Sequence, residues 1–167
     1  MIFIVMGVSG CGKSSVAQAL AHEIGGEYLD ADPYHPPANV EKMSRGIPLT
    51  DEDRWGWLDV LAGLLRERTS GSTVLACSAL KESYRQRLRV SPEVRFVYLK
   101  GSFEVIEARM RARRDHFMKP GLLESQFAAL EEPATGPGTD AAAFDVTQTV
   151  DQIIAMIVET FSLRSHV

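Results

Sequence analysis

A glycine-rich segment near the N-terminus, Gly7–Ser14 (GVSGCGKS), has the residue spacing of a loop that binds phosphate. Its glycines would let backbone N–H groups curl around a phosphate without Cβ clashes, and a helix beginning there would add its positive dipole end. Lys13 would reach the β- and γ-phosphates of a nucleoside triphosphate, and the hydroxyl of Ser14 would ligate Mg²⁺. The alternative is an incidental glycine turn, but a strand-like segment precedes the loop and a helical pattern follows it, as the motif requires. We therefore predict that the phosphates of ATP are bound by Gly7, Val8, Ser9, Gly10, Cys11, Gly12, Lys13, Ser14 and Ser15.

Other classes of P-loop protein carry further motifs that this chain lacks. A GTPase would need an Asn-Lys pair to read its base, but the single asparagine, Asn39, is followed by Val40. The third segment with strand character ends in Ala76-Cys77-Ser78, without the aspartate of a Walker B motif. The size of the chain and these missing motifs favour a small kinase of the nucleoside monophosphate or shikimate kinase type over a switch or a motor.

Two carboxylates, Asp30 and Asp32, follow the second segment with strand character. Residues i and i+2 of a strand share a face, so both side chains would point the same way. Asp32, further out, would accept a proton from the substrate hydroxyl or orient it, and Asp30 would hold Mg²⁺ through water. The alternative is a turn in which aspartate bonds to backbone N–H groups.

A basic stretch in the second half of the chain has the character of a lid over the phosphates. Arg109 and Arg113 are spaced to share a helix face, and in kinases of this type such arginines neutralise the transferring phosphoryl group. Arg111 and Arg114 would face solvent, and the whole stretch could instead be a solvated basic helix end. We expect a mobile lid over about 111–121, with Arg113 in a catalytic role and both Arg109 and Arg113 at the nucleotide. The 135–139 loop is similar in position to the segment that flanks adenine in related kinases.

Strand-like and helical segments alternate along the chain, and this order would bring the candidate residues together. It predicts an α/β fold of three layers, a P-loop kinase fold with about five parallel strands and helices on both faces. Ligands of such sheets bind at the carboxyl ends of the strands. We expect one kinase domain over 1–167, with strands at Ile2–Met6, Glu27–Leu29, Thr73–Cys77, Val94–Leu99 and Ala143–Val146.

The composition is that of an ordinary globular protein, with 45% apolar and 24% charged residues. The net charge of −4 argues against binding to nucleic acid or an anionic membrane, because such proteins have a basic footprint. The apolar N-terminus is too short for a signal peptide or a membrane span. Two cysteines, Cys11 and Cys77, give no disulfide framework, so we expect free thiols and a cytoplasmic location.

Several blocks of sequence together resemble the gluconokinases, from Ile2 to about Glu132. They include His35-Pro36, the N-x-x-K-M of 39–43, the segment GIPLTDEDRWGWL of 46–58, CSALKESYR of 77–85 and FVYLKG of 96–101. The resemblance implies transfer of phosphate from MgATP to the 6-hydroxyl of D-gluconate, and it suggests a homodimer. Gly56 departs from the family pattern, which usually has proline before Trp57.

Gluconate carries a carboxylate at one end, so its pocket needs a cation there and hydrogen-bonding groups along the polyol. Arg54 is our first candidate for the carboxylate because a guanidinium binds bidentately, and Lys81 and Arg85 are alternatives. His35 and Lys42 could contact hydroxyl groups. Each has a simpler explanation, since Arg54 could pair with Asp51 or Asp53, and Lys42 and Arg85 could be surface charges.

Two other functions stay open from the sequence. One is a kinase for a different polyol acid such as shikimate, although the glycine triplet of shikimate kinases is replaced by Ser78-Ala79-Leu80-Lys81. The other is a nucleotide-binding module without transfer activity, which would have no need of a proton acceptor such as Asp32.

Overall fold

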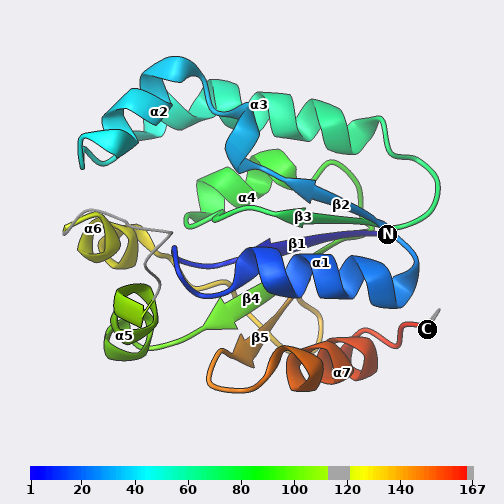
Figure 1. Ribbon diagram of the computed structural model, residues 1–167. Helices are drawn as coiled ribbons and strands as arrows, with labels where there is room; N and C mark the ends of the chain where they lie inside the picture. The colour runs from blue at the N-terminus through cyan, green and yellow to red at the C-terminus, as the bar shows by residue number, and fades with distance from the viewer. Residues whose placement is uncertain (113–120, 165–167) are drawn as a thin grey trace.

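The computed structural model describes residues 1–112 and 121–164, which form one parallel β-sheet between layers of helices (Figure 1). The strand order is β2-β3-β1-β4-β5, and all neighbouring pairs are parallel. The strands are β1 (Ile2–Met6), β2 (Glu27–Asp30), β3 (Thr73–Ala76), β4 (Val94–Lys100) and β5 (Ala141–Asp145). The predicted α/β architecture with five parallel strands is therefore confirmed.

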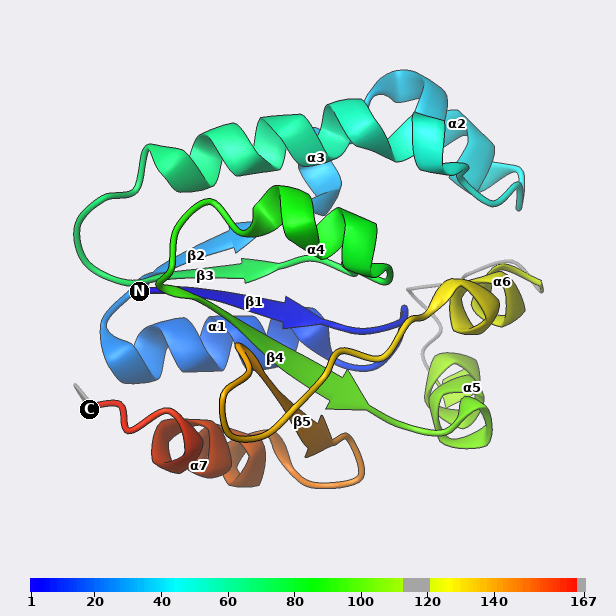
Figure 2. The same ribbon diagram turned by 180° about the vertical axis from the view of Figure 1, so that it is seen from behind.

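Helices cover both faces of the sheet. The helix α1 (Lys13–Ile24) lies in front of the sheet in Figure 1, and α4 (Glu82–Leu88) lies in front of it in Figure 2. The helix α7 (Val150–Thr160) packs against α1, and α3 (Asp51–Arg66) packs against α4. Among the described residues, no helix is both long enough and apolar enough to cross a bilayer.

Three short helices gather beyond the carboxyl ends of the strands, away from both chain termini (Figures 1 and 2). They are α2 (Pro37–Ser44), α5 (Phe103–Ala112) and α6 (Leu122–Ala129), and a 3₁₀ turn, η1 (Asp32–Tyr34), follows β2. This is the end of a parallel sheet at which ligands are expected to bind.

The core follows from the apolar pattern of the central elements. Every residue of β1 is buried, because this strand lies between β3 and β4 with helices on both faces. Val16, Leu20 and Ile24, spaced four apart, are the buried face of α1. The P-loop between these two elements is thereby anchored to the buried core of the molecule.

The start of α3 is set by a capping box that joins Thr50 and Asp53. The Thr50 Oγ1 accepts a bond from the Asp53 N–H at 3.2 Å, and Asp53 Oδ2 accepts one from the Thr50 N–H at 2.9 Å. An N-terminal cap contributes about 1 kcal/mol and fixes where the helix begins. Asp51 and Arg54 are consequently held in the first turn of α3, at the ligand-binding end of the sheet.

Candidate active site

The P-loop joins β1 to α1 and has a backbone that only glycine adopts easily. Gly10 and Gly12 have φ angles of 80° and 97°. A Cβ atom at Gly10 would also lie 2.6 Å from Cγ of Met110 in α5, so either the loop or the Met110 side chain would have to shift. The Lys13 ammonium turns back over the loop and donates to the carbonyls of Gly7 and Val8, at 3.1 and 3.0 Å. The loop therefore combines a glycine backbone, a helix N-terminus and a lysine at one point, as phosphate binding requires.

A cavity of about 780 Å³ opens beside the P-loop, between α2, α3, α6 and the carboxyl ends of the strands. The site residues predicted from the sequence that line it are Ser9, Lys13, Asp32, His35, Arg54 and Lys81. It is completed by Val40, Met43, Ser44, Pro48, Leu49, Thr50, Asp51, Glu52, Trp57, Ser78, Leu122, Ser125, Gln126 and Ala129. Donor-side and acceptor-side candidates thus share one space, which is large enough for a small ligand.

The two carboxylates after β2 do not share a strand face, contrary to the sequence argument. Asp30 ends β2, whereas Asp32 opens the η1 turn, and the Asp32 N–H donates to Asp30 Oδ1 at 3.0 Å. The turn expected as an alternative is therefore present, but it is made by Asp30 and leaves Asp32 on the cavity. Burial by the surrounding protein and repulsion from Asp30 raise the pKa of Asp32, although the Lys13 ammonium opposes this shift. A carboxylate in such surroundings is a stronger proton acceptor than one in water.

His35 is held in a defined protonation state by residues behind it. Its ring stacks on Trp57 with a centroid distance of 4.0 Å, and the Asn39 amide donates to His35 Nδ1 at 3.2 Å. Because the amide donates, Nδ1 is the acceptor and the ring proton sits on Nε2. Burial and the nearby Arg54 charge lower the pKa of His35 to about 4, so the ring is neutral near pH 7. His35 therefore contributes a neutral ring to the cavity wall, consistent with a hydroxyl contact.

Trp57 and Asn39, which hold the His35 ring, are themselves fixed by further hydrogen bonds. Trp57 is 2% exposed, and its indole N–H donates to the Ala31 carbonyl at 2.8 Å. The same side chain also borders the cavity. Asn39, also 2% exposed, donates a second bond to the Asp53 carbonyl at 2.8 Å and so ties α2 to α3. Nothing local in the sequence marks Asn39 as a support for His35.

Another side of the cavity is lined by charged residues at the start of α3 and by Lys81, which precedes α4. Lys81 donates to Asp51 Oδ1 at 2.9 Å, and the Tyr84 hydroxyl donates to the same oxygen. The bonds from Tyr84 and Lys81 lower the pKa of Asp51, and the bond to Asp51 raises the pKa of Lys81, so Asp51 and Lys81 stay charged and neutralise each other. Arg54 donates instead to the Leu49 carbonyl at 2.8 Å and to Tyr84 at 3.1 Å.

The simpler explanation for Arg54 required an ion pair with Asp51 or Asp53, and neither pair is present in the part of the chain that the structure describes. Within the described residues Arg54 forms no ion pair, and both hydrogen bonds come from one of its nitrogens, NH1. The remaining donors of this guanidinium leave it able to bind a carboxylate in the cavity.

Two of the predicted substrate contacts do not reach the cavity. Lys42 pairs with Asp53 at 2.8 Å, and its bond is the main reason that the pKa of Asp53 falls to about 2. Arg85 is neither a pocket residue nor a surface charge, since it is 1% exposed. The prediction is therefore wrong for Arg85, whereas Lys42 is 38% exposed and its contact with a hydroxyl stays a prediction.

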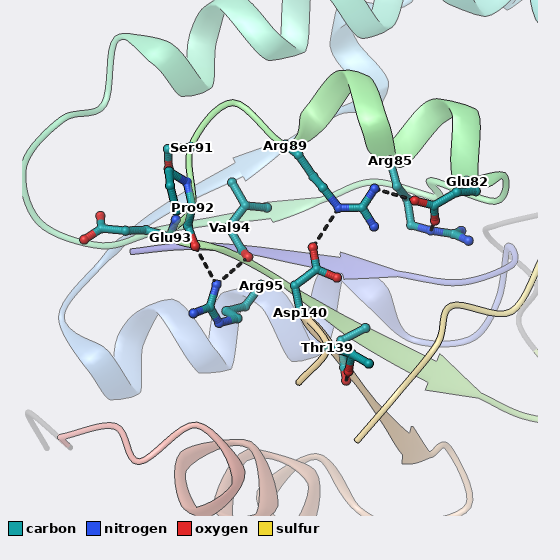
Figure 3. A network of polar contacts seen from close by, with 11 residues as sticks. Glu82, Arg85, Arg89, Ser91, Pro92, Glu93, Val94, Arg95, Thr139 and Asp140 are labelled. Carbon is teal, nitrogen blue, oxygen red and sulfur yellow. Dashed lines mark hydrogen bonds and ion pairs between the residues drawn. The ribbon is translucent and has the colours of Figure 1, made fainter. Parts of the chain in front are cut away.

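Arg85, which Figure 3 shows beside Glu82 of α4, joins the segments behind the site. It donates to the carbonyls of Ala79 and Glu131, both at 2.7 Å, and to Glu82 Oε2 at 3.1 Å. Ala79 has a φ angle of 44°, a left-handed conformation that is rare for residues other than glycine. The side chain therefore fixes a strained turn between Ser78 and Lys81, which both line the cavity.

Of the arginines expected in or near the lid, Arg109 and Arg111 are among the described residues. Arg113 lies outside the described residues, as do 113–120 of the lid expected at 111–121. Arg111 is 77% exposed and pairs with Glu107 at 3.0 Å, which confirms its predicted solvent-facing position. Arg109 does not line the cavity, and its guanidinium donates to the Val146 carbonyl, just after β5.

The 135–139 loop is not beside the P-loop. It leads into the start of β5, where Asp140 accepts a bond from the Phe96 N–H at 2.8 Å. Because β5 is parallel to β1, the segment after β5 lies at the same end of the sheet as the P-loop, and Val146 belongs to that segment. The 135–139 loop therefore lies before β5 and not at the P-loop end of the sheet, contrary to the expected flanking position.

Comparisons with known proteins agree with this geometry. The family described as shikimate kinase matches residues 9–161. The thermoresistant gluconokinase of Escherichia coli (strain K12) is 44% identical, with 95% of this chain and 91% of that protein covered. A solved gluconokinase of Sinorhizobium meliloti 1021 is 42% identical, with a TM-score of 0.83 over 96% of this chain and 94% of that one. A solved, unliganded sugar kinase of Janibacter sp. HTCC2649 is 44% identical, with a TM-score of 0.89 over 97% and 94%.

Proposed function

The chain belongs to the gluconokinases, within the wider shikimate kinase family, and we propose that it transfers the γ-phosphoryl group of ATP to the 6-hydroxyl of D-gluconate. One observation carries the substrate assignment. A single cavity is bordered by P-loop residues, by a carboxylate with a raised pKa and by an arginine with unused donors. A donor phosphate, a hydroxyl acceptor and a carboxylate tail each find a matching group there.

The acceptor half of the reaction would begin at Asp32. Its carboxylate accepts the proton of the 6-hydroxyl as the oxygen attacks the γ-phosphorus, and the bond from that phosphorus to the bridging oxygen of ADP breaks. Arg54 binds the substrate carboxylate and so fixes which hydroxyl reaches Asp32. His35, neutral and anchored by Asn39, bonds to a hydroxyl along the polyol.

The donor half depends on the P-loop. Lys13 leaves the carbonyls of Gly7 and Val8 and binds the β- and γ-phosphates, where its charge stabilises the transferring group. Arg109, and Arg113 from outside the described residues, are proposed to neutralise the same phosphates. Backbone N–H groups of the loop complete the cradle.

The chain also offers oxygen ligands that fit Mg²⁺. The hydroxyl of Ser14 is exposed in the first turn of α1, and the Asp30 carboxylate ends β2. No three His, Cys, Asp or Glu side chains gather into a metal site within 1–112 and 121–164. Mg²⁺ commonly binds through one or two protein oxygens and the substrate phosphates, so this sparse donor set is suitable. When bound, the ion would neutralise phosphate charge, with Ser14 and Asp30 holding it directly or through water.

Two further expectations accompany the proposal. The thiols of Cys11 and Cys77 are free and buried, which supports a reducing cytoplasm as the location. The homodimer implied by the resemblance stays a prediction.

The decisive experiment is a panel assay of ATP consumption with D-gluconate, other sugar acids, shikimate and nucleoside monophosphates. We expect rapid turnover with gluconate only, and mass spectrometry should find one phosphate on the product. Lys13→Ala is the control and should remove activity. Faster turnover with another acid would support the alternative substrate, and no turnover with any acceptor would favour a binding module.

A further inference from the structure

Helix α6 connects the donor and acceptor halves of the site. Its C-terminal end is fixed to the loop after β3, where the Glu131 N–H donates to the Leu80 carbonyl at 2.8 Å. Its side is fixed to α5 by Phe127, whose ring lies 5.5 Å from that of Phe103. At the P-loop, Gln126 Oε1 accepts a bond from the Ser9 N–H at 2.7 Å. The helix is thereby held on three sides, and Gln126 is its contact with the P-loop.

The bond to Ser9 determines how the Gln126 amide is oriented. A backbone N–H can only donate, so the atom that faces it must be the amide oxygen. The amide nitrogen then points away from Ser9, and it has no partner among the described protein residues. Gln126 is one of the residues that line the cavity. Its two N–H donors are therefore presented to a ligand.

The position of Ser9 indicates which ligand group would meet these donors. Of the P-loop residues, Ser9 and Lys13 are the two that border the cavity shared with Asp32. Transfer requires the γ-phosphoryl group to pass between the P-loop and the hydroxyl activated by Asp32. Phosphoryl oxygens only accept hydrogen bonds, whereas a hydroxyl can both donate and accept. The Gln126 amide nitrogen only donates, so a phosphoryl oxygen is the better match.

We propose that Gln126 is a catalytic residue whose amide nitrogen donates to an oxygen of the phosphoryl group in transfer, while the Ser9 N–H holds its amide oxygen. This rests on the proposed function for the existence of the transfer, but the contact with the γ-phosphate can be tested without gluconate. Donors already positioned where charge develops can contribute about 10²–10³ in kcat. No sequence motif pointed to Gln126.

The test compares two nucleotides on one set of variants. Gln126→Glu keeps the shape and the acceptor for Ser9 but replaces the donors with a negative charge, and Gln126→Met removes both polar atoms. Glu124→Gln, exposed on the same helix, is the matched control. Isothermal titration with Mg²⁺ would measure the affinities for ADP and for the imido analogue of ATP, and thermal melting would verify that each variant folds.

We expect both Gln126 variants to lose affinity for the ATP analogue, by about tenfold or more for Gln126→Glu, while ADP affinity changes less than about twofold. Their kcat with gluconate should fall by about 10²-fold, and Glu124→Gln should match the wild type. Equal weakening of both nucleotides would show a merely structural bond to the P-loop and would overturn the proposal. Unchanged nucleotide affinities with a raised KM for gluconate would overturn it too. Absence of gluconate turnover in the wild type would count against the proposed function alone, since the nucleotide comparison needs no acceptor.

Discussion

Replacing Arg85 with methionine should destabilise the protein strongly, although the sequence suggested a substrate contact. The side chain is 1% exposed and connects α4 to the Ala79 turn and to the segment after α6. Methionine has a similar length and is apolar, so Arg85→Met removes the hydrogen bonds without opening a large cavity.

The size of the effect follows from the three bonds. The two carbonyl acceptors, on Ala79 and Glu131, lie 2.7 Å from a charged donor, and each such bond contributes about 1.5–3 kcal/mol. The bond to Glu82 adds little, because that carboxylate is 44% exposed and water replaces its partner. Removing a buried charge recovers some desolvation energy. We expect a net loss of about 3 kcal/mol, which for a chain of this size lowers the Tm by about 6–12 °C.

Urea denaturation and calorimetry would measure this loss, with Arg87→Met as the matched control. Arg87 lies on the same helix but is 40% exposed, and its ion pair with Asp59 at 2.6 Å should contribute less than about 1 kcal/mol. If the two variants were equally stable and Arg85→Met instead raised the KM for gluconate, Arg85 would be a substrate contact and the reasoning from burial would be refuted.

Three other substitutions test the candidate site and helix α3. Asp32→Asn should lower kcat by about 10²–10⁴. The pKa of Asp32 is higher in the folded state than in the unfolded state, so the free energy of unfolding decreases as pH rises through the folded-state pKa. Asp32→Asn should therefore melt no lower than the wild type at pH 7. A clearly lower Tm of this variant would contradict the argument. Arg54→Lys should raise the KM for gluconate by about 10–100-fold, through loss of bidentate binding, and leave the KM for ATP unchanged; an equal rise in both would exclude a carboxylate contact. Gly56→Ala should raise the free energy of unfolding by about 0.5–1 kcal/mol, because Gly56 is inside α3 and an added Cβ has no atom within 4 Å. Urea titration would measure this change, and a loss of stability would contradict the prediction.

Much of the fold was predictable from local pattern. The apolar run Ile2–Met6 is β1 to the residue, because a central parallel strand needs apolar side chains on both faces. The start of α3 also depends on local residues alone, because its capping box joins Thr50 to Asp53, three residues later. The last strand was placed at Ala143–Val146 but occupies Ala141–Asp145. Alanine has little preference for strands, so pairing with β4 decides where β5 begins.

The site was less predictable, because its side chains depend on partners far away in the sequence. Asp32 was identified as a cavity residue, but the turn that presents it was expected only as an alternative to a shared strand face. Gln126 was missed, since its partner Ser9 lies 117 residues away. A local pattern carries no information about such contacts.

The sequence by itself determined the phosphate-binding half of the protein. Gly7–Ser14 is contiguous, and its function depends on backbone groups and on a lysine at a fixed offset, so the spacing alone specifies the chemistry. Only the tertiary structure decided which cations are available to the acceptor. Lys81 is neutralised by Asp51, which lies 30 residues away in the sequence, and Arg85 donates to buried backbone carbonyls. Arg54 has N–H groups without a partner in the described residues, and these can bind a ligand. The physical reason is that a charge is available to a substrate only when folding leaves it accessible and without an opposite charge.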